Sequence, residues 1–119
     1  MNIRDILYCE DDRCTRDAVA STLRDNFASY GLILAYDIES ATRKAPSIEQ
    51  LALVITDGNL QLDDTGWDLA EQLRKNGYTG PVVYLGAANI PEDKRGLFNS
   101  ILTKPVDSHK LIATLKKYI

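Results

Sequence analysis

The sequence predicts an α/β fold in which five parallel strands form one doubly wound sheet with helices on both faces. Short apolar runs alternate with segments of helical periodicity five times along the chain. The runs are continuously apolar, as in strands that are buried on both faces. The segments between them are long enough for right-handed helical crossovers, which place helices on both faces of a parallel sheet.

The expected strands are five short apolar runs bounded by polar or turn-forming residues. The third run, LALVI, is the most apolar of the five. The runs comprise residues 6–9, 32–36, 51–55, 81–85 and 100–102.

The first two helices are predicted from apolar spacing and from a capping residue. Val19, Leu23 and Phe27 recur every four residues, which is one face of a helix. Gly31 is expected to end this helix. Asp37 can cap the second helix, because its carboxylate can accept hydrogen bonds from the free N–H groups of the first turn.

The remaining three helices differ in length. The third covers residues 67–73 and stops at Gly77, which suits a helix C-terminus. Residues 91–99 leave room only for a short fourth helix. Asp107 or Ser108 caps the last helix. The apolar side of that helix carries Leu111, Ile112, Leu115 and Tyr118.

Composition indicates one globular domain that spans residues 1–119. Apolar residues make up 45% of the chain and charged residues 26%, which is typical of folded proteins. The net charge of −3 argues against a direct nucleic-acid surface. No apolar run reaches the roughly 20 residues of a membrane span, and the N-terminal segment lacks a signal-peptide pattern. We therefore expect a cytoplasmic protein without membrane insertion, in which Cys9 and Cys14 are free thiols.

Charged residues directly follow three of the predicted strands. Glu10 and Asp11 follow the first, Asp57 the third and Lys104 the fifth. The carboxyl ends of parallel strands meet at one edge of the sheet, where ligands bind in this class of fold. Converging carboxylates repel each other unless a cation is present, and Mg²⁺ suits such oxygen ligands. Each residue alone is more often a solvated loop residue or a helix cap, but together they favour phosphoryl transfer to an aspartate nucleophile.

Four segments resemble the receiver domains of bacterial response regulators. ILYCEDD, VITDGNL, PVVYLGAA and ILTKP occur in the family's order and extend over essentially the whole chain. The resemblance implies a flavodoxin-like receiver topology. It also implies a phosphoacceptor function in two-component signal transduction, in which the domain signals through altered partner binding and is not an enzyme. The phosphoryl donor would be a histidine kinase or a histidine phosphotransfer protein, and the downstream protein partner is unknown.

The resemblance also implies a role for each residue at the predicted edge. Asp57 would be the phosphoacceptor. Glu10, Asp11 and Asp57 would hold Mg²⁺ together with the backbone carbonyl of Asn59. Lys104 would pair with the phosphoryl oxygens.

Two further residues near these segments are given structural roles by the resemblance. The peptide bond between Lys104 and Pro105 would be cis. Asp12 would cap the first helix.

Two positions depart from the family pattern. Gly86 stands where the family has a serine or threonine that contacts the phosphoryl group, and Ile101 stands where it has a switch aromatic. We therefore expect phosphorylation to occur but to shift the conformational equilibrium weakly. The double substitution Gly86→Thr and Ile101→Tyr is expected to enlarge the response.

Two other functions remain open from the sequence. A pseudo-receiver would act as a phosphorylation-independent interaction module, which Gly86 and Ile101 favour and the intact acids and lysine oppose. A phosphatase of the haloacid-dehalogenase type also uses an aspartate nucleophile. Its acid–base aspartate would fall at Asn59, and 119 residues leave no room for a cap domain.

Overall fold

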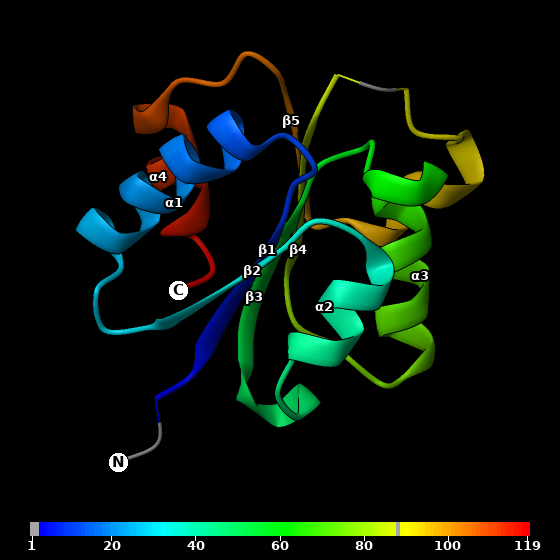
Figure 1. Cartoon of the computed structure of the whole chain (residues 1–119), viewed down its shortest axis with the longest axis horizontal. Helices are drawn as coiled ribbons and strands as arrows, with labels where there is room; N and C mark the ends of the chain where they lie inside the picture. The colour runs from blue at the N-terminus through cyan, green and yellow to red at the C-terminus, as the bar shows by residue number, and fades with distance from the viewer. Residues whose placement is uncertain (1–2, 88) are drawn as a thin grey trace.

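The five predicted strands form one fully parallel sheet in the order β2-β1-β3-β4-β5 (Figure 1). The structure is a computed structural model that describes residues 3–87 and 89–119, so that Ala88 in the segment PVVYLGAA lies outside it. The strands are β1 (Asp5–Cys9), β2 (Gly31–Ala35), β3 (Leu51–Thr56), β4 (Val82–Gly86) and β5 (Ser100–Thr103). The predicted class, a doubly wound five-stranded parallel α/β sheet, is confirmed.

Helices cover both faces of the sheet. The α-helices are α1 (Arg13–Asn26), α2 (Ile38–Lys44), α3 (Gly66–Lys75) and α4 (Ser108–Leu115). The 3-10 helices are η1 (Ile48–Gln50), η2 (Gln61–Asp63) and η3 (Glu92–Leu97). Helices α1 and α4 lie on one face, and α2 and α3 lie on the other, with η3 beside α3 (Figure 1). The short fourth helix that the sequence predicts is η3. None of the helices in the described part of the chain has the length and apolar character needed to cross a bilayer.

Aspartate side chains cap the first turn of three helices. Asp12, Asp37 and Asp107 accept a backbone N–H at the starts of α1, α2 and α4 respectively. These caps agree with the sequence-based expectations, and Asp107 is the cap of α4 where Ser108 had been the alternative. Each cap satisfies one of the N–H groups that a helix N-terminus leaves without an intrahelical partner.

Gly31 does not end the first helix as expected. Helix α1 stops at Asn26, and the N–H of the buried residue Phe27 closes it by donating to the carbonyl oxygen of Leu23. Gly31 instead begins β2, where a Cβ would lie 2.1 Å from Oδ1 of Asp5. The prediction mistook a strand residue for a helix stop.

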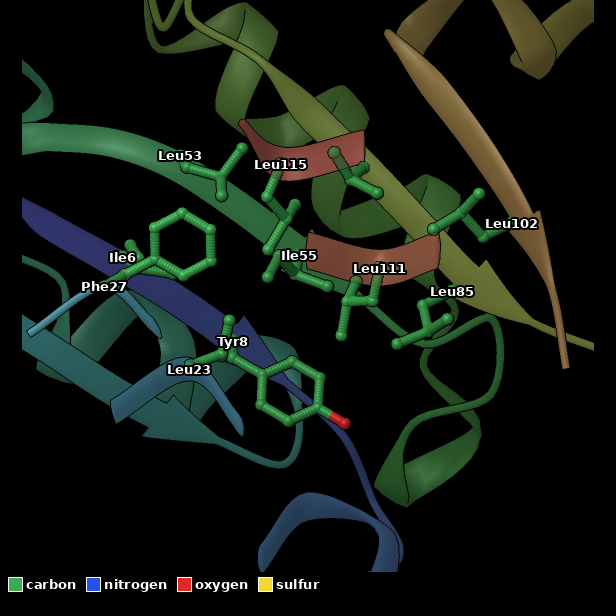
Figure 2. Packing of buried hydrophobic residues seen from close by; sticks show 11 residues of the cluster. Ile6, Tyr8, Leu23, Phe27, Leu53, Ile55, Leu85, Leu102, Leu111 and Leu115 are labelled. Atoms are coloured by element: carbon green, nitrogen blue, oxygen red, sulfur yellow. The ribbon is translucent and has the colours of Figure 1, made fainter. Parts of the chain in front are cut away.

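Two hydrophobic clusters fill the layers on the two sides of the sheet. The first lies under α1 and α4 (Figure 2) and comprises Ile6, Tyr8, Leu23, Phe27, Leu53, Ile55, Val83, Leu85, Leu102, Leu111 and Leu115. The second lies under α2 and α3 and includes Leu7, Cys9, Val54, Leu69, Ala70 and Val82. Alternate residues of β1, β3 and β4 thus enter opposite layers, as the continuous apolar runs predicted, whereas the edge strand β2 is half-buried. Cys9 is buried and Cys14 is exposed, and both are free thiols as predicted.

Arg74 near the end of α3 ties that helix to the segments on either side of β4. Its guanidinium donates to the carbonyl oxygens of Tyr78, Gly80 and Leu97 at 3.0, 2.7 and 3.0 Å, and to Oδ1 of Asn99 at 3.0 Å. The Leu97 and Asn99 contacts anchor the chain that leaves η3 and enters β5. The position of η3 is thus held by α3 as well as by the sheet.

Arg74→Ala should lower the free energy of unfolding by about 2–4 kcal/mol, because it removes three partly buried charge-assisted hydrogen bonds and one exposed one. Urea unfolding followed by circular dichroism would measure the change. The matched control is Arg43→Ala, which removes an exposed pair with Glu39 and should change stability by less than about 0.5 kcal/mol. Equal effects of the two substitutions would contradict the anchoring role of Arg74.

Candidate functional site

The charged residues that the sequence predicts at one edge of the sheet are brought together there. Glu10 follows β1 and Asp57 follows β3, and these two strands are neighbours in the sheet. The backbone N–H of Asp57 donates to the carbonyl oxygen of Cys9 at 2.9 Å, and that of Lys104 donates to the carbonyl oxygen of Gly86 at 3.1 Å. The ladder hydrogen bonds therefore continue past the strand ends and fix the backbone of the site.

An ion-paired lysine joins the two carboxylates. Nζ of Lys104 lies 2.7 Å from Oε1 of Glu10 and 3.4 Å from Oδ1 of Asp57. The side chain of Glu10 is 1% exposed and that of Asp57 9%, so both acids are removed from water. The backbone N–H of Gly58 donates to Oδ1 of Asp57 at 2.7 Å, which holds this carboxylate in one orientation. The peptide bond between Lys104 and Pro105 is cis, the form that the resemblance implied.

Three carboxylates offer a set of oxygen ligands at this edge. Glu10, Asp11 and Asp57 can each contribute one oxygen, and these atoms all lie within 4.8 Å of one another. Hard divalent cations such as Mg²⁺ prefer oxygen ligands and typically take only one or two carboxylates from the protein. The donor set therefore fits Mg²⁺.

The environment of Glu10 disfavours its ionised form. Burial, followed by the hydrogen-bonding neighbour Asp57, raises the pKa of Glu10 from 4.5 to about 7, although the hydrogen bond from Lys104 acts in the opposite direction. Burial lowers the pKa of Lys104, but its pairing with Glu10 and Asp57 outweighs this and raises the pKa overall. The lysine is therefore held in its charged form, and a second cation would favour ionisation of the crowded acids.

Two residues that the sequence analysis missed support Glu10. The hydroxyl of Tyr8 donates to Oε1 of Glu10 at 3.3 Å, and Nη1 of Arg16 donates to the Glu10 backbone carbonyl at 2.9 Å. Tyr8 lies two residues before Glu10, and the period of two along a strand was a signal that it shares a face with that acid. The contact of Arg16 depends on how α1 packs and left no signal in the sequence.

The loop after Asp57 is held by a short antiparallel bridge between Asn59 and Thr65. The N–H of Gly66 donates to the carbonyl oxygen of Gly58 at 3.0 Å, which closes the loop at the start of α3. A Cβ on Gly66 would lie 2.2 Å from the backbone oxygen of Asp57. Close approach of α3 to the acid therefore requires glycine at this position. The bridge fixes the backbone on both sides of Asn59, whose proposed role as a carbonyl ligand remains a prediction.

Gly86, the last residue of β4, lies against Asp57. A Cβ at this position would be 2.9 Å from Oδ1 of Asp57 and 2.9 Å from the backbone nitrogen of Gly58. Both distances are shorter than ordinary contacts, and the second involves backbone. The structure thus argues against Gly86→Thr as a simple gain of a hydroxyl, because the added side chain would displace the acid or its loop. Ile101 of β5 pairs in register with Tyr84.

The comparisons with known proteins rest on structure. No family model matches the sequence, and no curated protein matches it significantly. Among solved structures, the non-phosphorylated HemR receiver domain of Leptospira biflexa is 27% identical, with a TM-score of 0.82 over 97% of this chain and 93% of that chain. The chemotaxis response regulator CheY4 of Vibrio cholerae is 25% identical, with a TM-score of 0.77 over 98% and 99% of the two chains.

A third neighbour is the N-terminal domain of an uncharacterised protein from Wolinella succinogenes. It is 22% identical, with a TM-score of 0.83 over 97% of this chain and 93% of that chain, and shows the fold alone. The similarity to the two named receiver domains covers almost the full length of both partners in each comparison. The chain therefore has the flavodoxin-like fold of response-regulator receiver domains, and its resemblance to that family, predicted from four sequence segments, is confirmed by structure.

Proposed function

We propose that this chain is a phosphoacceptor receiver domain of a two-component system, phosphorylated on Asp57 by a histidine kinase or a histidine phosphotransfer protein. The observation that carries the proposal is the contact of Lys104 with both Glu10 and Asp57, at 2.7 and 3.4 Å, beside a third carboxylate. A merely solvated loop edge would not bury two acids around one lysine. The signal would leave the domain as altered binding of a downstream protein in the cytoplasm.

The chemistry needs positioning and charge neutralisation more than covalent assistance. A carboxylate oxygen of Asp57 attacks the phosphorus of a phosphohistidine. The new P–O bond forms as the P–N bond breaks. The electron pair of the P–N bond returns to the imidazole of the donor. The N–H of Gly58 orients the nucleophile, and Lys104 places positive charge beside the oxygens of the transferred group.

Mg²⁺ would be held by Glu10, Asp11, Asp57 and the backbone carbonyl of Asn59. It would offset the negative charge of the phosphoryl oxygens and of the clustered carboxylates. The oxygen-only donor set supports this assignment.

A pseudo-receiver is the second candidate, and a specific observation favours it. Gly86 and Ile101 supply neither a hydroxyl nor an aromatic ring where related domains use both, and η3 replaces a full helix. In that case the domain would bind a partner without regulated phosphorylation. The retained acids and Lys104 oppose this alternative.

Incubation with Mg²⁺ and acetyl phosphate should add one phosphoryl group to the wild-type chain, measured as the intact mass. Asp57→Asn is the control, because it removes the nucleophile while keeping the size of the side chain, and it should stay unmodified. Equal labelling of both proteins would reject Asp57 as the acceptor. No labelling of the wild type, with acetyl phosphate or with a phosphorylated histidine phosphotransfer protein, would favour the pseudo-receiver.

Mg²⁺ affinity should fall by about tenfold for each pH unit below about 7, because a proton must leave Glu10 before this acid can bind a cation. Above that pH the affinity should level off. Isothermal titration calorimetry with Mg²⁺ over this range would measure the slope. Glu10→Gln should bind Mg²⁺ more weakly and with little dependence on pH in the same interval. A wild-type affinity that is constant through neutral pH would contradict the assignment of Glu10 as a ligand with a raised pKa.

A further inference from the structure

A buried tyrosine of β1 lies directly beside the most deeply buried acid of the site. Tyr8 and Glu10 are both completely buried, and the Tyr8 hydroxyl donates to Oε1 of Glu10 at 3.3 Å. The N–H of Glu10 donates to the carbonyl oxygen of Ala35 at 2.9 Å, so this residue continues the strand ladder by one step. Side chains two residues apart on such backbone point to the same face, which brings the phenol and the carboxylate together.

The ring of Tyr8 is held by the hydrophobic layer under α1 and α4. It belongs to the first cluster, and its hydroxyl oxygen lies at the margin of that cluster (Figure 2). Side chains in a close-packed interior have few alternative positions. The hydroxyl therefore meets Glu10 from a fixed direction.

Tyr8 is one of three donors to the Glu10 carboxylate. Nζ of Lys104 also donates to Oε1, at 2.7 Å, and the backbone N–H of Asp12 donates to Oε2 at 3.2 Å. The lysine is shared, because its Nζ also lies 3.4 Å from Oδ1 of Asp57. In the proposed function Lys104 pairs in addition with the phosphoryl oxygens, which draws it away from Glu10. The hydroxyl of Tyr8 is then the side-chain donor that remains on this acid.

The orientation of Glu10 matters because its carboxylate belongs to the candidate Mg²⁺ site. One of its oxygens lies within 4.8 Å of oxygens of Asp11 and Asp57. Its side chain is only 1% exposed, so that protein donors, and not bulk water, must orient it. Groups that hydrogen-bond a metal ligand hold it in its binding geometry, and the loss of one typically lowers metal affinity by about 10–100-fold.

We propose that Tyr8 is a positioning residue for Glu10, whose carboxylate its hydroxyl holds in the orientation that binds a divalent cation. This inference rests on the proposed function and adds a residue to the same site. Tyr8 acts on the side chain of Glu10, whereas Arg16 holds the backbone carbonyl of the same residue.

Tyr8→Phe keeps the ring in the core and removes only the hydroxyl. Its Mg²⁺ affinity should fall about tenfold, at the lower end of the range for groups that orient a metal ligand. Isothermal titration calorimetry at about pH 8.5 would measure it, because Glu10 is then ionised and the difference reflects orientation. The matched control is Tyr78→Phe, which also removes a buried hydroxyl, the donor to the carbonyl oxygen of Pro81 at 3.0 Å. Its Mg²⁺ affinity should stay within about twofold of the wild type.

A double-mutant cycle separates positioning from packing. Glu10→Ala removes both carboxylate oxygens, so that the Tyr8 hydroxyl has no metal ligand left to orient. Adding Tyr8→Phe to this variant should change its Mg²⁺ affinity by less than about twofold. Both chains are titrated to Mg²⁺ concentrations that saturate the weaker site. A structural role of Tyr8 would instead lower the affinity equally in both backgrounds.

Three outcomes would overturn the role of Tyr8. They are wild-type Mg²⁺ affinity in Tyr8→Phe, an equal loss in Tyr78→Phe, and an undiminished loss in the Glu10→Ala background. Phosphoryl labelling of the wild type by acetyl phosphate would leave the proposed function intact in each of these cases. A wild-type chain that neither binds Mg²⁺ nor accepts a phosphoryl group would overturn the proposed function and this inference with it.

Discussion

The contact of Lys104 with two buried carboxylates is the interaction on which the site depends. Glu10 and Asp57 end neighbouring strands at one edge of the sheet, where their charges would repel each other if both were ionised without a cation. Nζ of Lys104 reaches both, at 2.7 and 3.4 Å, and so offsets part of the cost of burying them. Burial raises the pKa of Glu10 even with the lysine beside it, so the ionised form of this acid stays disfavoured.

The carboxyl ends of the strands position the residues of this interaction. Residues distant in sequence meet because parallel strands share one carboxyl edge, and ladder hydrogen bonds hold the backbone of Asp57 and Lys104 one step beyond the strands. A helix cap and a loop bridge likewise fix the segments that connect the strands to the helices. Asp12 starts α1 directly after the acids, and the Asn59–Thr65 bridge brings α3 back to Asp57. The site is therefore built on backbone that the sheet makes rigid.

The sequence could predict the strands and the clustered acids because both follow local rules. Continuous apolar runs indicate buried strands, and a charge that directly follows such a run falls at the carboxyl edge. What it could not predict depends on packing between distant elements. Gly31 looked like a helix stop, although it is the first residue of β2. The four hydrogen bonds of Arg74 join segments with no common pattern. The support of Glu10 by Arg16 is of the same kind.

At positions 86 and 101 this chain departs from the receiver-family pattern, and the neighbouring residues on the same face of the sheet help to explain the local structure there. Side chains two residues apart along a strand point to the same side, so Tyr84 and Gly86 share a face, and Ile101 lies opposite Tyr84 on β5. Compared with the family pattern position by position, Gly86 lacks a hydroxyl and Ile101 lacks an aromatic ring. The structure adds a large buried side chain near both positions: the hydroxyl of Tyr84 borders Gly58 and Gly86, and its ring packs edge-to-face on Phe98. The tyrosine does not fill all the space near these positions, because Gly86, Tyr84 and Ile101 line a cavity of about 120 Å³.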